Sequence, residues 1–496
     1  MKRINFIYIA TILLLQLTLL NSCLKKELSD YDHGAVPELL LESGLEDKYL
    51  LNVGDELKLV SDLSKEGVNP ADYTFKWSYY PKDSNTEVIP IEVGTTESLN
   101  LKSDMATGLY FLVLEVTNKQ SGVKYFRKMD LIVKRLTSEG WLLLTHKSDE
   151  TNLSIVTPDE YVLKDFLVHS SEYPMREKPL EIICMNDWDG IVQPLAIRTA
   201  APQIYFIDHN TMEVKSNAND AFTGTTNAKF DFFGSDMWYG LYYLRDTDGN
   251  FYTAPRGVGE NDNFPYGFSN ALLGNHVLAP MMIPTSSSYP IQALFYDQEN
   301  KKLVYHPTSS PEIESFQPAG VNVAFDMNNF DENVIYAANG ASGSSYIVGE
   351  KNGKYTLYEM RLDNGLSEYP AVSKVNLIAP NGKQLTHFAL SGKNPLLYFI
   401  AGNQLYVYKM NDQQYAPLYT FPAGEEVAAL KMLKEPIVPP TIPFAENRLG
   451  IATNSGTEGV FYTFDLSPTG VLKTGSFNSR IGDFSPIVDI VYKESK

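Results

Sequence analysis

The sequence predicts an all-β protein with two folded parts, a small β-sandwich and a longer region of repeated sheets behind it. Three observations predict this fold class. The 496 residues include 31 Tyr and 25 Phe, which favour strands. Glycines and prolines separate short segments in which apolar residues alternate with a period of two. Past Leu136, no segment shows a convincing helical period.

The first element is a signal peptide, expected over residues 1–22. A short positive region, Lys2-Arg3, precedes an apolar run over residues 6–20, and this layout is typical of secretory signals. The run is too short for a stable membrane span. Leu20-Asn21-Ser22-Cys23 has the form of a lipobox, so we expect cleavage before Cys23 and attachment of lipid to it. The alternative is an ordinary signal peptide with a chance cysteine.

Residues 23–37 are expected to form a flexible tether, because they are charged and lack apolar periodicity. Besides Cys23 the chain has only Cys184, so lipidation of Cys23 excludes an intramolecular disulfide. The formal net charge is −19, and such an acidic surface repels nucleic acid and anionic lipid head groups. We therefore expect no nucleic-acid partner.

Residues 38–135 are predicted to form the sandwich. Over residues 73–79 aromatic side chains alternate with Thr74, Lys76 and Ser78, as a half-buried strand requires. One further strand is expected directly after the Gly54-Asp55 turn. Two more are expected near the end of the region, over residues 108–116 and 124–133. Trp77 on a middle strand is typical of an immunoglobulin-like sandwich.

Three motifs in this region, in this order, resemble a polycystic-kidney-disease (PKD) type domain. They are Gly54-Asp55-Glu56-Leu57, Phe75-Lys76-Trp77, and Gly108-Leu109-Tyr110 before a Leu-Val-Leu-Glu-Val strand. The Asp-Phe-Gly-Asp-Gly signature of standard PKD domains is missing after Trp77. Behind a lipobox and ahead of a long β region, the chain resembles the PKD-like family lipoproteins of Bacteroidota.

The resemblance implies a lipid-anchored protein of the outer membrane that faces the cell exterior. It implies an accessory role in nutrient uptake beside a TonB-dependent importer and its lidding lipoprotein. The nutrient is expected to be a peptide or a glycan, since both bind to exposed aromatic side chains.

Residues 137–496 are predicted to form a β-propeller-like domain of four-stranded blades. The expected second strands start at intervals of 41 to 62 residues, which gives seven blades, with six or eight as the alternatives. These strands are expected over residues 141–145, 195–198, 241–245, 293–296, 334–338, 396–401 and 449–453. Innermost strands are expected over residues 180–184, 229–233, 321–326, 385–390 and 427–433, the last with a short helix as its alternative. In the fourth blade, residues 276–283 are a weak candidate because Pro280 pairs poorly.

The first blade has no innermost strand in front of Trp141. Residues 486–492 show the same apolar alternation as the innermost strands expected in the other blades, and they have no other strand to pair with. We expect this C-terminal strand to close the ring, which would remove the open sheet edges.

No catalytic motif is found, and we expect neither a metal nor a cofactor. The segment Asp246-Thr247-Asp248-Gly249-Asn250 is either a calcium loop or a hairpin turn. Its glycine comes too early for a calcium loop, and Gly257 stands where the last ligand, a Glu, belongs. An Asp-Gly step is favoured in tight hairpins.

The candidate binding face is built from the loops between first and second strands, which leave a propeller on one side. These loops contain Asp187, Trp188, Asp189, Asp236, Trp238, Tyr289 and residues 435–447. Both tryptophans are therefore expected on one face. They are either capped by the sandwich or line an open groove, where aromatic rings and flanking carboxylates would suit a sugar or a peptide.

Three functions stay open. The chain is a non-catalytic surface lipoprotein that binds or hands over nutrient, a structural or protein-docking scaffold, or a propeller hydrolase. A glycosidase needs two facing carboxylates, and a sequence with 60 acidic residues does not single out a pair.

Overall fold

The computed structural model describes residues 39, 41–42, 44–82, 89–185, 194–236, 240–255, 265–285, 291–362, 366, 368–434, 445–473 and 478–494. Over these ranges the backbone forms strands and short 3-10 helices, without an α-helix. A helix long and apolar enough to cross a membrane is not found in them. Contacts between residues divide the chain into two units, Met1–Arg135 and Leu136–Lys496.

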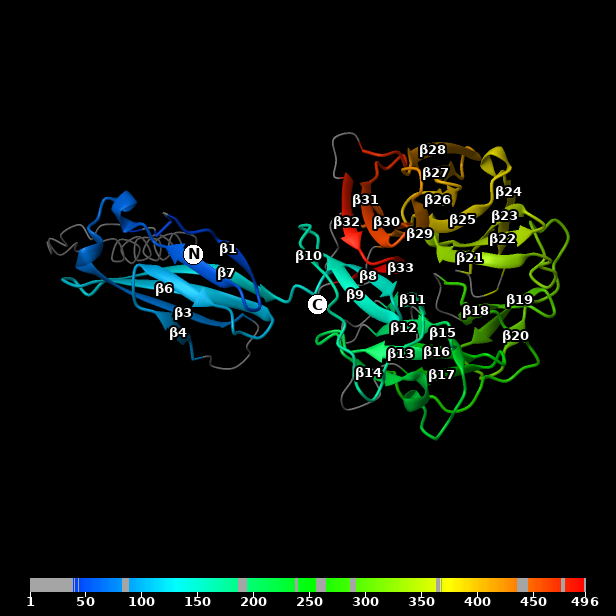
Figure 1. Ribbon diagram of the computed structural model, residues 1–496, viewed down its shortest axis with the longest axis horizontal. Coiled ribbons are helices and arrows are strands. Elements are labelled where there is room, and N and C mark those ends of the chain that lie inside the picture. Colours follow the sequence, from blue (N-terminus) through cyan, green and yellow to red (C-terminus); the bar gives the residue numbers. More distant parts are fainter. Residues whose placement is uncertain are drawn as a thin grey trace, which may run out of the picture. The chain divides into compact units, whose positions relative to one another are not determined.

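The first unit is a sandwich of two sheets (Figure 1). The larger sheet has the order β1-β7-β6-β3-β4, in which β1 runs parallel to β7, and the smaller sheet pairs β2 with β5. The strands are β1 (Lys48–Asn52), β2 (Glu56–Val60), β3 (Tyr73–Pro81), β4 (Ile91–Gly94), β5 (Ser98–Lys102), β6 (Gly108–Asn118) and β7 (Lys124–Lys134). The 3-10 helices η1 (Leu63–Glu66) and η2 (Pro70–Asp72) precede β3.

Trp77 lies at the centre of the sandwich core. Its side chain is fully buried, and Tyr73, Phe75 and Tyr79 of the same strand belong to the same hydrophobic cluster. The predicted inward face of β3 is thereby confirmed. The indole Nε1 of Trp77 donates a hydrogen bond to the carbonyl oxygen of Thr96 at 2.9 Å, so the polar edge of the buried ring is satisfied.

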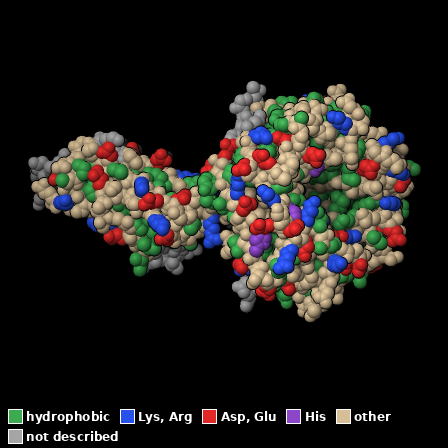
Figure 2. Space-filling model, in the orientation of Figure 1, with side chains coloured by type: hydrophobic (Ala, Val, Ile, Leu, Met, Phe, Trp, Pro, Cys, Tyr) green, Lys and Arg blue, Asp and Glu red, His purple; other side chains and the backbone are tan. Residues whose placement is uncertain are grey.

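The described residues of the second unit form seven sheets, numbered here in chain order, and Figure 1 shows them following one another around a centre. Sheet 1 has the order β33-β8-β9-β10, sheet 2 is β11 to β14, sheet 3 is β15 to β17, and sheet 4 is β18 to β20. Sheets 5, 6 and 7 are β21 to β24, β25 to β28 and β29 to β32. Figure 2 shows acidic, basic and hydrophobic side chains interspersed over the visible face of this unit, which is hollowed near its middle.

The strands of sheets 1 to 4 are β8 (Gly140–Lys147), β9 (Glu150–Val156), β10 (Val162–Leu163), β11 (Pro179–Cys184), β12 (Leu195–Thr199), β13 (Ile204–Ile207), β14 (Val214–Asn217), β15 (Phe230–Ser235), β16 (Leu241–Asp246), β17 (Phe251–Pro255), β18 (Ile291–Asp297), β19 (Lys302–Pro307), β20 (Glu314–Ser315) and, from the C-terminus, β33 (Ile487–Lys493). Those of sheets 5 to 7 are β21 (Asn333–Asn339), β22 (Ser345–Lys351), β23 (Lys354–Met360), β24 (Ala371–Leu377), β25 (Leu385–Leu390), β26 (Leu396–Ala401), β27 (Gln404–Lys409), β28 (Gln414–Thr420), β29 (Glu426–Met432), β30 (Arg448–Ser455), β31 (Glu458–Asp465) and β32 (Asn478–Phe484). Short 3-10 helices are η3 (Ala218–Ala221), η4 (Ala341–Gly343) and η5 (Pro380–Gly382).

The C-terminal strand β33 pairs antiparallel with β8, with Ile490 opposite Leu143 and Tyr492 opposite Trp141. The predicted partner of the C-terminal strand is therefore correct. In Figure 1, β33 (red) runs beside β8 (cyan), and it also contacts β11 of sheet 2 and β29 of sheet 7. The ring of Trp141 packs 5.8 Å from the ring of Phe461 on β31, which joins sheet 1 to sheet 7.

One predicted strand has a different place in its sheet. Residues 334–338 were expected to be a second strand, but they lie in β21, the first strand of sheet 5. Residues 321–326, the expected innermost strand, are not a strand, and Val321 is 92% exposed. The second strand is β22, and a tight turn with positive φ at Asn352 and Gly353 connects it to β23.

The irregular part of sheet 4 is where the sequence predicted it. Residues 276–283 form no strand, yet isolated bridges join Leu278 to Asp297 and Ile283 to Leu294 on β18. The backbone N–H of Ala279 donates to the carbonyl oxygen of Tyr296 at 2.8 Å. Pro280 has no N–H to donate, so the pairing beside it stays incomplete.

The remaining strand predictions in this unit agree with the structure. Residues 427–433 lie in strand β29 and its end, and the helix alternative is wrong. The predicted second strands outside sheet 5 lie in β8, β12, β16, β18, β26 and β30.

Candidate functional site

Most of the predicted site residues lie outside the part of the chain that the structure describes. They are Asp187, Trp188, Asp189, Trp238 and Tyr289, together with the lipidation site Cys23. The expectation that both tryptophans share one face therefore stays a prediction. Asp236 is described.

Asp236 follows β15 directly, and its side chain is buried. Its carboxylate accepts hydrogen bonds from the backbone N–H groups of Gly240 at 3.0 Å and Leu241 at 3.1 Å. It also accepts one from Nε2 of Gln292 on β18 at 3.1 Å. Asp236 thus fixes the end of its loop and joins sheet 3 to sheet 4, which is a positioning role.

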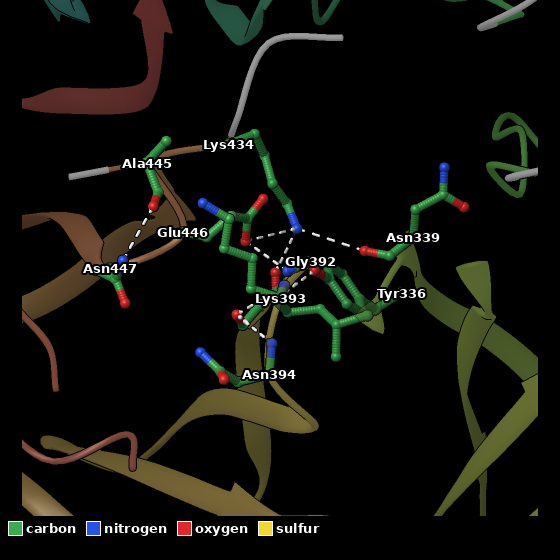
Figure 3. A network of polar contacts seen from close by, with 11 residues as sticks. Tyr336, Asn339, Gly392, Lys393, Asn394, Lys434, Ala445, Glu446 and Asn447 are labelled. Atoms are coloured by element: carbon green, nitrogen blue, oxygen red, sulfur yellow. Dashed lines mark hydrogen bonds and ion pairs between the residues drawn. The ribbon is translucent and has the colours of Figure 1, made fainter. Parts of the chain in front are cut away.

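Lys434 joins the ends of three inner strands, as Figure 3 shows. It follows β29, and its ammonium donates to the carbonyl oxygens of Leu390 at 2.5 Å and Asn339 at 3.4 Å, the last residues of β25 and β21. Its Nζ lies 3.7 Å from Oε2 of Glu446, which also accepts a hydrogen bond from the N–H of Gly392. Burial lowers the pKa of Lys434, and the negative charge of Glu446 opposes that shift.

This network holds the C-terminal ends of β21, β25 and β29 together. The N–H of Leu390 also donates to the hydroxyl of Tyr336 on β21 at 3.0 Å. Burial raises the pKa of Tyr336. Polar contacts therefore join the ends of these three strands.

A cavity of about 540 Å³ opens between sheets 5 and 6, next to this network. Its volume is within the range of small-molecule sites. The lining combines one carboxylate, Glu359, with two cations, Arg361 and Lys393, and two tyrosines, Tyr346 and Tyr408. Lys393 belongs to the loop between β25 and β26, whose Gly392 is bonded to Glu446.

Glu359 of β23 is fixed by two hydroxyl groups. Its Oε1 accepts a hydrogen bond from Oγ of Ser344 at 2.9 Å, and its Oε2 accepts one from Oγ of Ser373 at 3.0 Å. Burial and the charge of Glu359 raise the pKa of Tyr346 to about 12. The phenol of Tyr346 is therefore neutral at physiological pH and is able to donate a hydrogen bond.

Tyr408 lies on β27, and only 4% of its surface is exposed. Its ring packs in the hydrophobic cluster between sheets 5 and 6. Its hydroxyl oxygen is buried and has no hydrogen-bond partner among the described residues. Buried polar groups in proteins are almost always bonded, so this hydroxyl calls for a polar group in the cavity that Tyr408 lines.

The segment Asp246–Asn250 is a hairpin turn, and the hairpin interpretation is confirmed. It connects β16 to β17, with Gly249 at a φ of 93°. The carboxylate of Asp246 accepts hydrogen bonds from the backbone N–H and Nδ2 of Asn250, both at 2.9 Å. Over the described ranges, no group of three or more His, Cys, Asp or Glu side chains is placed to hold a metal ion.

The sequence did not reveal Glu359, Arg361, Lys393 or Tyr408 as a group. Glu359 and Arg361 lie close together at the end of β23 in sheet 5, but Lys393 and Tyr408 belong to sheet 6 and are distant from them along the chain. One signal was present, because Glu359 is the single acidic residue of strand β23, whose other residues after Lys354 are apolar or carry hydroxyl groups.

A family model described as PKD-like family matches residues 29–179. The match covers the first unit and continues past Arg135 into the first strands of the second. No curated protein sequence matches the chain.

Solved structures that resemble the chain include a dehydrogenase, a dehydrogenase-like protein and a β-propeller domain. A quinonprotein alcohol dehydrogenase-like protein from Bacteroides thetaiotaomicron has 11% identity over 92% of this chain and 99% of its own, with a TM-score of 0.46. The dihydro-heme d1 dehydrogenase NirN has 8% identity over 76% of this chain and 72% of its own, with a TM-score of 0.41. The β-propeller domain of Cps50 (Swd1) from Myceliophteria thermophila has 8% identity over 72% of this chain and 94% of its own, with a TM-score of 0.40.

Proposed function

We propose that this chain is a non-catalytic binding protein on the outside of the outer membrane, anchored by lipid on Cys23. It takes a small polar ligand, a peptide or a glycan, in the cavity between sheets 5 and 6. The observation that carries this proposal is the cavity itself, which is lined by Glu359, Arg361, Lys393 and Tyr408, the last with a buried hydroxyl that has no hydrogen-bond partner among the described residues. A few polar groups on a partly apolar wall are characteristic of small-molecule sites.

The geometry of the cavity favours binding over hydrolysis. Glu359 is the one carboxylate among the described lining residues, and both of its oxygens accept hydrogen bonds from serine hydroxyls. Glycoside hydrolysis requires a pair of carboxylates on either side of the bond that breaks. The pKa of Tyr346 and that of Tyr408 are raised by burial, so neither phenol is suited to act as a general base near neutral pH.

The architecture that presents the cavity is, in this proposal, a seven-bladed propeller closed by β33. The pairing of β33 with β8 and its contacts with β11 and β29 support closure. The packing of Trp141 against Phe461 supports it too. A closed ring leaves no sheet edge open and keeps adjacent sheets, and hence the cavity walls, in register.

The proposed partner is a TonB-dependent importer with its lidding lipoprotein, to which the bound nutrient is handed over. The PKD-like match over residues 29–179 supports the resemblance that implies this partner. The alternative is a scaffold of the same complex that binds no ligand.

The test is purification of a tagged full-length protein from outer membranes in mild detergent. We expect the importer to be recovered with it, and Cys23→Ala to move the protein from the membrane fraction to the soluble fraction. Recovery of the protein without a partner at every salt concentration would contradict the importer assignment. Membrane retention of Cys23→Ala would contradict the lipid anchor.

A further inference from the structure

We infer that the cavity between sheets 5 and 6 recognises the carboxylate of an acidic ligand, which Arg361, Lys393 and the hydroxyl of Tyr408 bind together. This inference rests on the proposed function and names the chemical class of its ligand. Three features of the cavity carry it: its charge, its buried hydroxyl and its walls.

The first feature is the charge of the lining, which is opposite to that of the whole chain. The chain has a formal charge of −19, whereas the described lining contains two cations and one carboxylate. The two cations come from opposite walls, Arg361 after β23 of sheet 5 and Lys393 from the loop between β25 and β26 of sheet 6. A guanidinium binds a carboxylate through two parallel hydrogen bonds, and an ammonium adds a point charge.

Glu359 does not cancel this preference for an anion. Its two oxygens accept hydrogen bonds from Ser344 and Ser373, and Ser344 is fully buried. These bonds hold the carboxylate of Glu359 against sheet 5. In this position it is available to accept a hydrogen bond from a ligand hydroxyl or amide group.

The second feature is the hydroxyl of Tyr408. It is buried and lacks a partner among the described residues, which costs free energy in the unliganded protein. A neutral phenol that donates to a carboxylate makes a charge-assisted hydrogen bond, and burial strengthens such a bond. A carboxylate next to Tyr408 would therefore satisfy a group that the described residues leave unbonded.

The third feature is the apolar part of the walls, which includes Leu357, Val375 and Met410. Together with the tyrosine rings they suit the faces of a sugar ring or a small side chain. Two sources of the carboxylate fit this chemistry. One is a uronic acid of a glycan, and the other is the C-terminal carboxylate of a short peptide.

The experiment is calorimetric titration of the full-length protein in detergent with matched probes. The glycan pair is galacturonate and galactose, and the peptide pair is Gly-Leu and its C-terminal amide. We expect one acidic probe to bind at least about tenfold more tightly than its neutral partner, and the pair that shows this difference identifies the source. Arg361→Gln is expected to remove that preference.

Tyr408→Phe separates recognition from folding. It is expected to weaken binding of the acidic probe about fivefold or more without lowering the thermal midpoint, because the lost hydroxyl has no partner among the described residues. Lys374→Gln is the matched control, since Lys374 lies on β24 next to Ser373 but over the ring of Tyr358, away from the cavity lining. It should leave the affinities unchanged.

Equal affinity for acidic and neutral probes, or an Arg361→Gln variant that keeps the preference, would overturn the inference and leave the proposed binding function intact. Absence of binding by all four probes would also overturn the inference. A broader panel of neutral peptides and glycans then decides the proposed function separately. A lower thermal midpoint of Tyr408→Phe with unchanged affinity would show that the hydroxyl serves the fold, which contradicts its assigned role.

Discussion

At the residue scale, the buried carboxylate of Glu425 shows how single groups join strands in the second unit. Its Oε2 accepts hydrogen bonds from Oγ1 of Thr453 at 2.6 Å and the hydroxyl of Tyr462 at 2.7 Å. Its Oε1 accepts one from Nη2 of Arg480 at 2.8 Å. Burial by itself would raise the pKa of Glu425, but these three hydrogen bonds together lower it below its usual value.

This arrangement predicts a loss of stability in acid. The pKa of Glu425 is lower in the folded state than in the unfolded state. Its ionised carboxylate therefore stabilises the fold above the unfolded pKa of about 4.3, and this stabilisation is lost as the pH falls through the pKa of the folded state. We expect Glu425→Gln to lower the free energy of unfolding at pH 7 by about 1.5–3 kcal/mol. In this variant the free energy of unfolding should also decrease less than in the wild-type protein when the pH is lowered from 5 to 3. Denaturant titrations over this pH range measure both effects.

The neighbouring Glu426 is exposed and provides the control. Glu426→Gln should change the free energy of unfolding by no more than about 0.5 kcal/mol. Parallel pH profiles for the wild-type protein and Glu425→Gln would show that the three hydrogen bonds do not couple stability to pH.

At the element scale, the inner strands share a β-bulge. The register between the inner and the second strand shifts by one residue in sheets 1, 2, 3, 5, 6 and 7, at Ile487/Asp489, Pro179/Glu181, Phe230/Phe232, Val334/Tyr336, Thr386/Phe388 and Val427/Ala429. A bulge bends a strand and increases its twist. Its recurrence at the same end of each strand means that the inner strands are bent alike.

The C-terminal strand supplies the element-scale prediction. A chain that ends after Phe484 lacks β33, which leaves one edge of β8 unpaired and exposes Trp141 and Leu143. We expect this chain to lose the cooperative unfolding of the second unit and to bind a hydrophobic dye. Ile490→Ala, at a fully buried position, should cost about 2–5 kcal/mol in the free energy of unfolding.

A chain that ends after Lys493 keeps β33 and serves as the control. It should unfold like the full-length protein. Cooperative unfolding of the chain that lacks β33 would mean that the strand is dispensable for the stability of the second unit.

At the scale of the whole molecule, each unit has its own hydrophobic core. The cluster around Trp77 and Leu114 contains residues of the first unit, and the clusters of the second unit contain residues that follow Leu136. A unit with a separate core is able to fold without its neighbour.

We therefore predict that residues 38–135 and 136–496, produced separately, both fold. Differential scanning calorimetry of the full-length chain should show two transitions, and each fragment should reproduce one of them. A fragment that is unfolded by circular dichroism, while the full-length chain shows one transition, would show that the units depend on each other.

Local patterns determined a large part of the fold. The alternation over residues 73–79 predicted the inward face of β3, because successive side chains of any strand point to opposite faces. The step Asp248-Gly249 predicted a turn, because glycine adopts a positive φ at low cost. Residues 486–492 were assigned to the edge of β8, because they show the apolar alternation of the expected innermost strands and no such strand precedes Trp141.

The tertiary structure decided the order of strands within a sheet and the contacts between residues of separate strands, neither of which these local patterns contain. Periodicity indicates which side of a strand is buried but not the position of the strand in the sheet order. For this reason β21 was predicted to be a second strand, although it is the first strand of sheet 5. The hydrogen bonds of Glu425 and the lining of the cavity bring together residues from separate strands and sheets, as with Arg361 and Tyr408. Their meeting depends on how sheets pack and twist, which is set by long-range contacts rather than by neighbours in the chain.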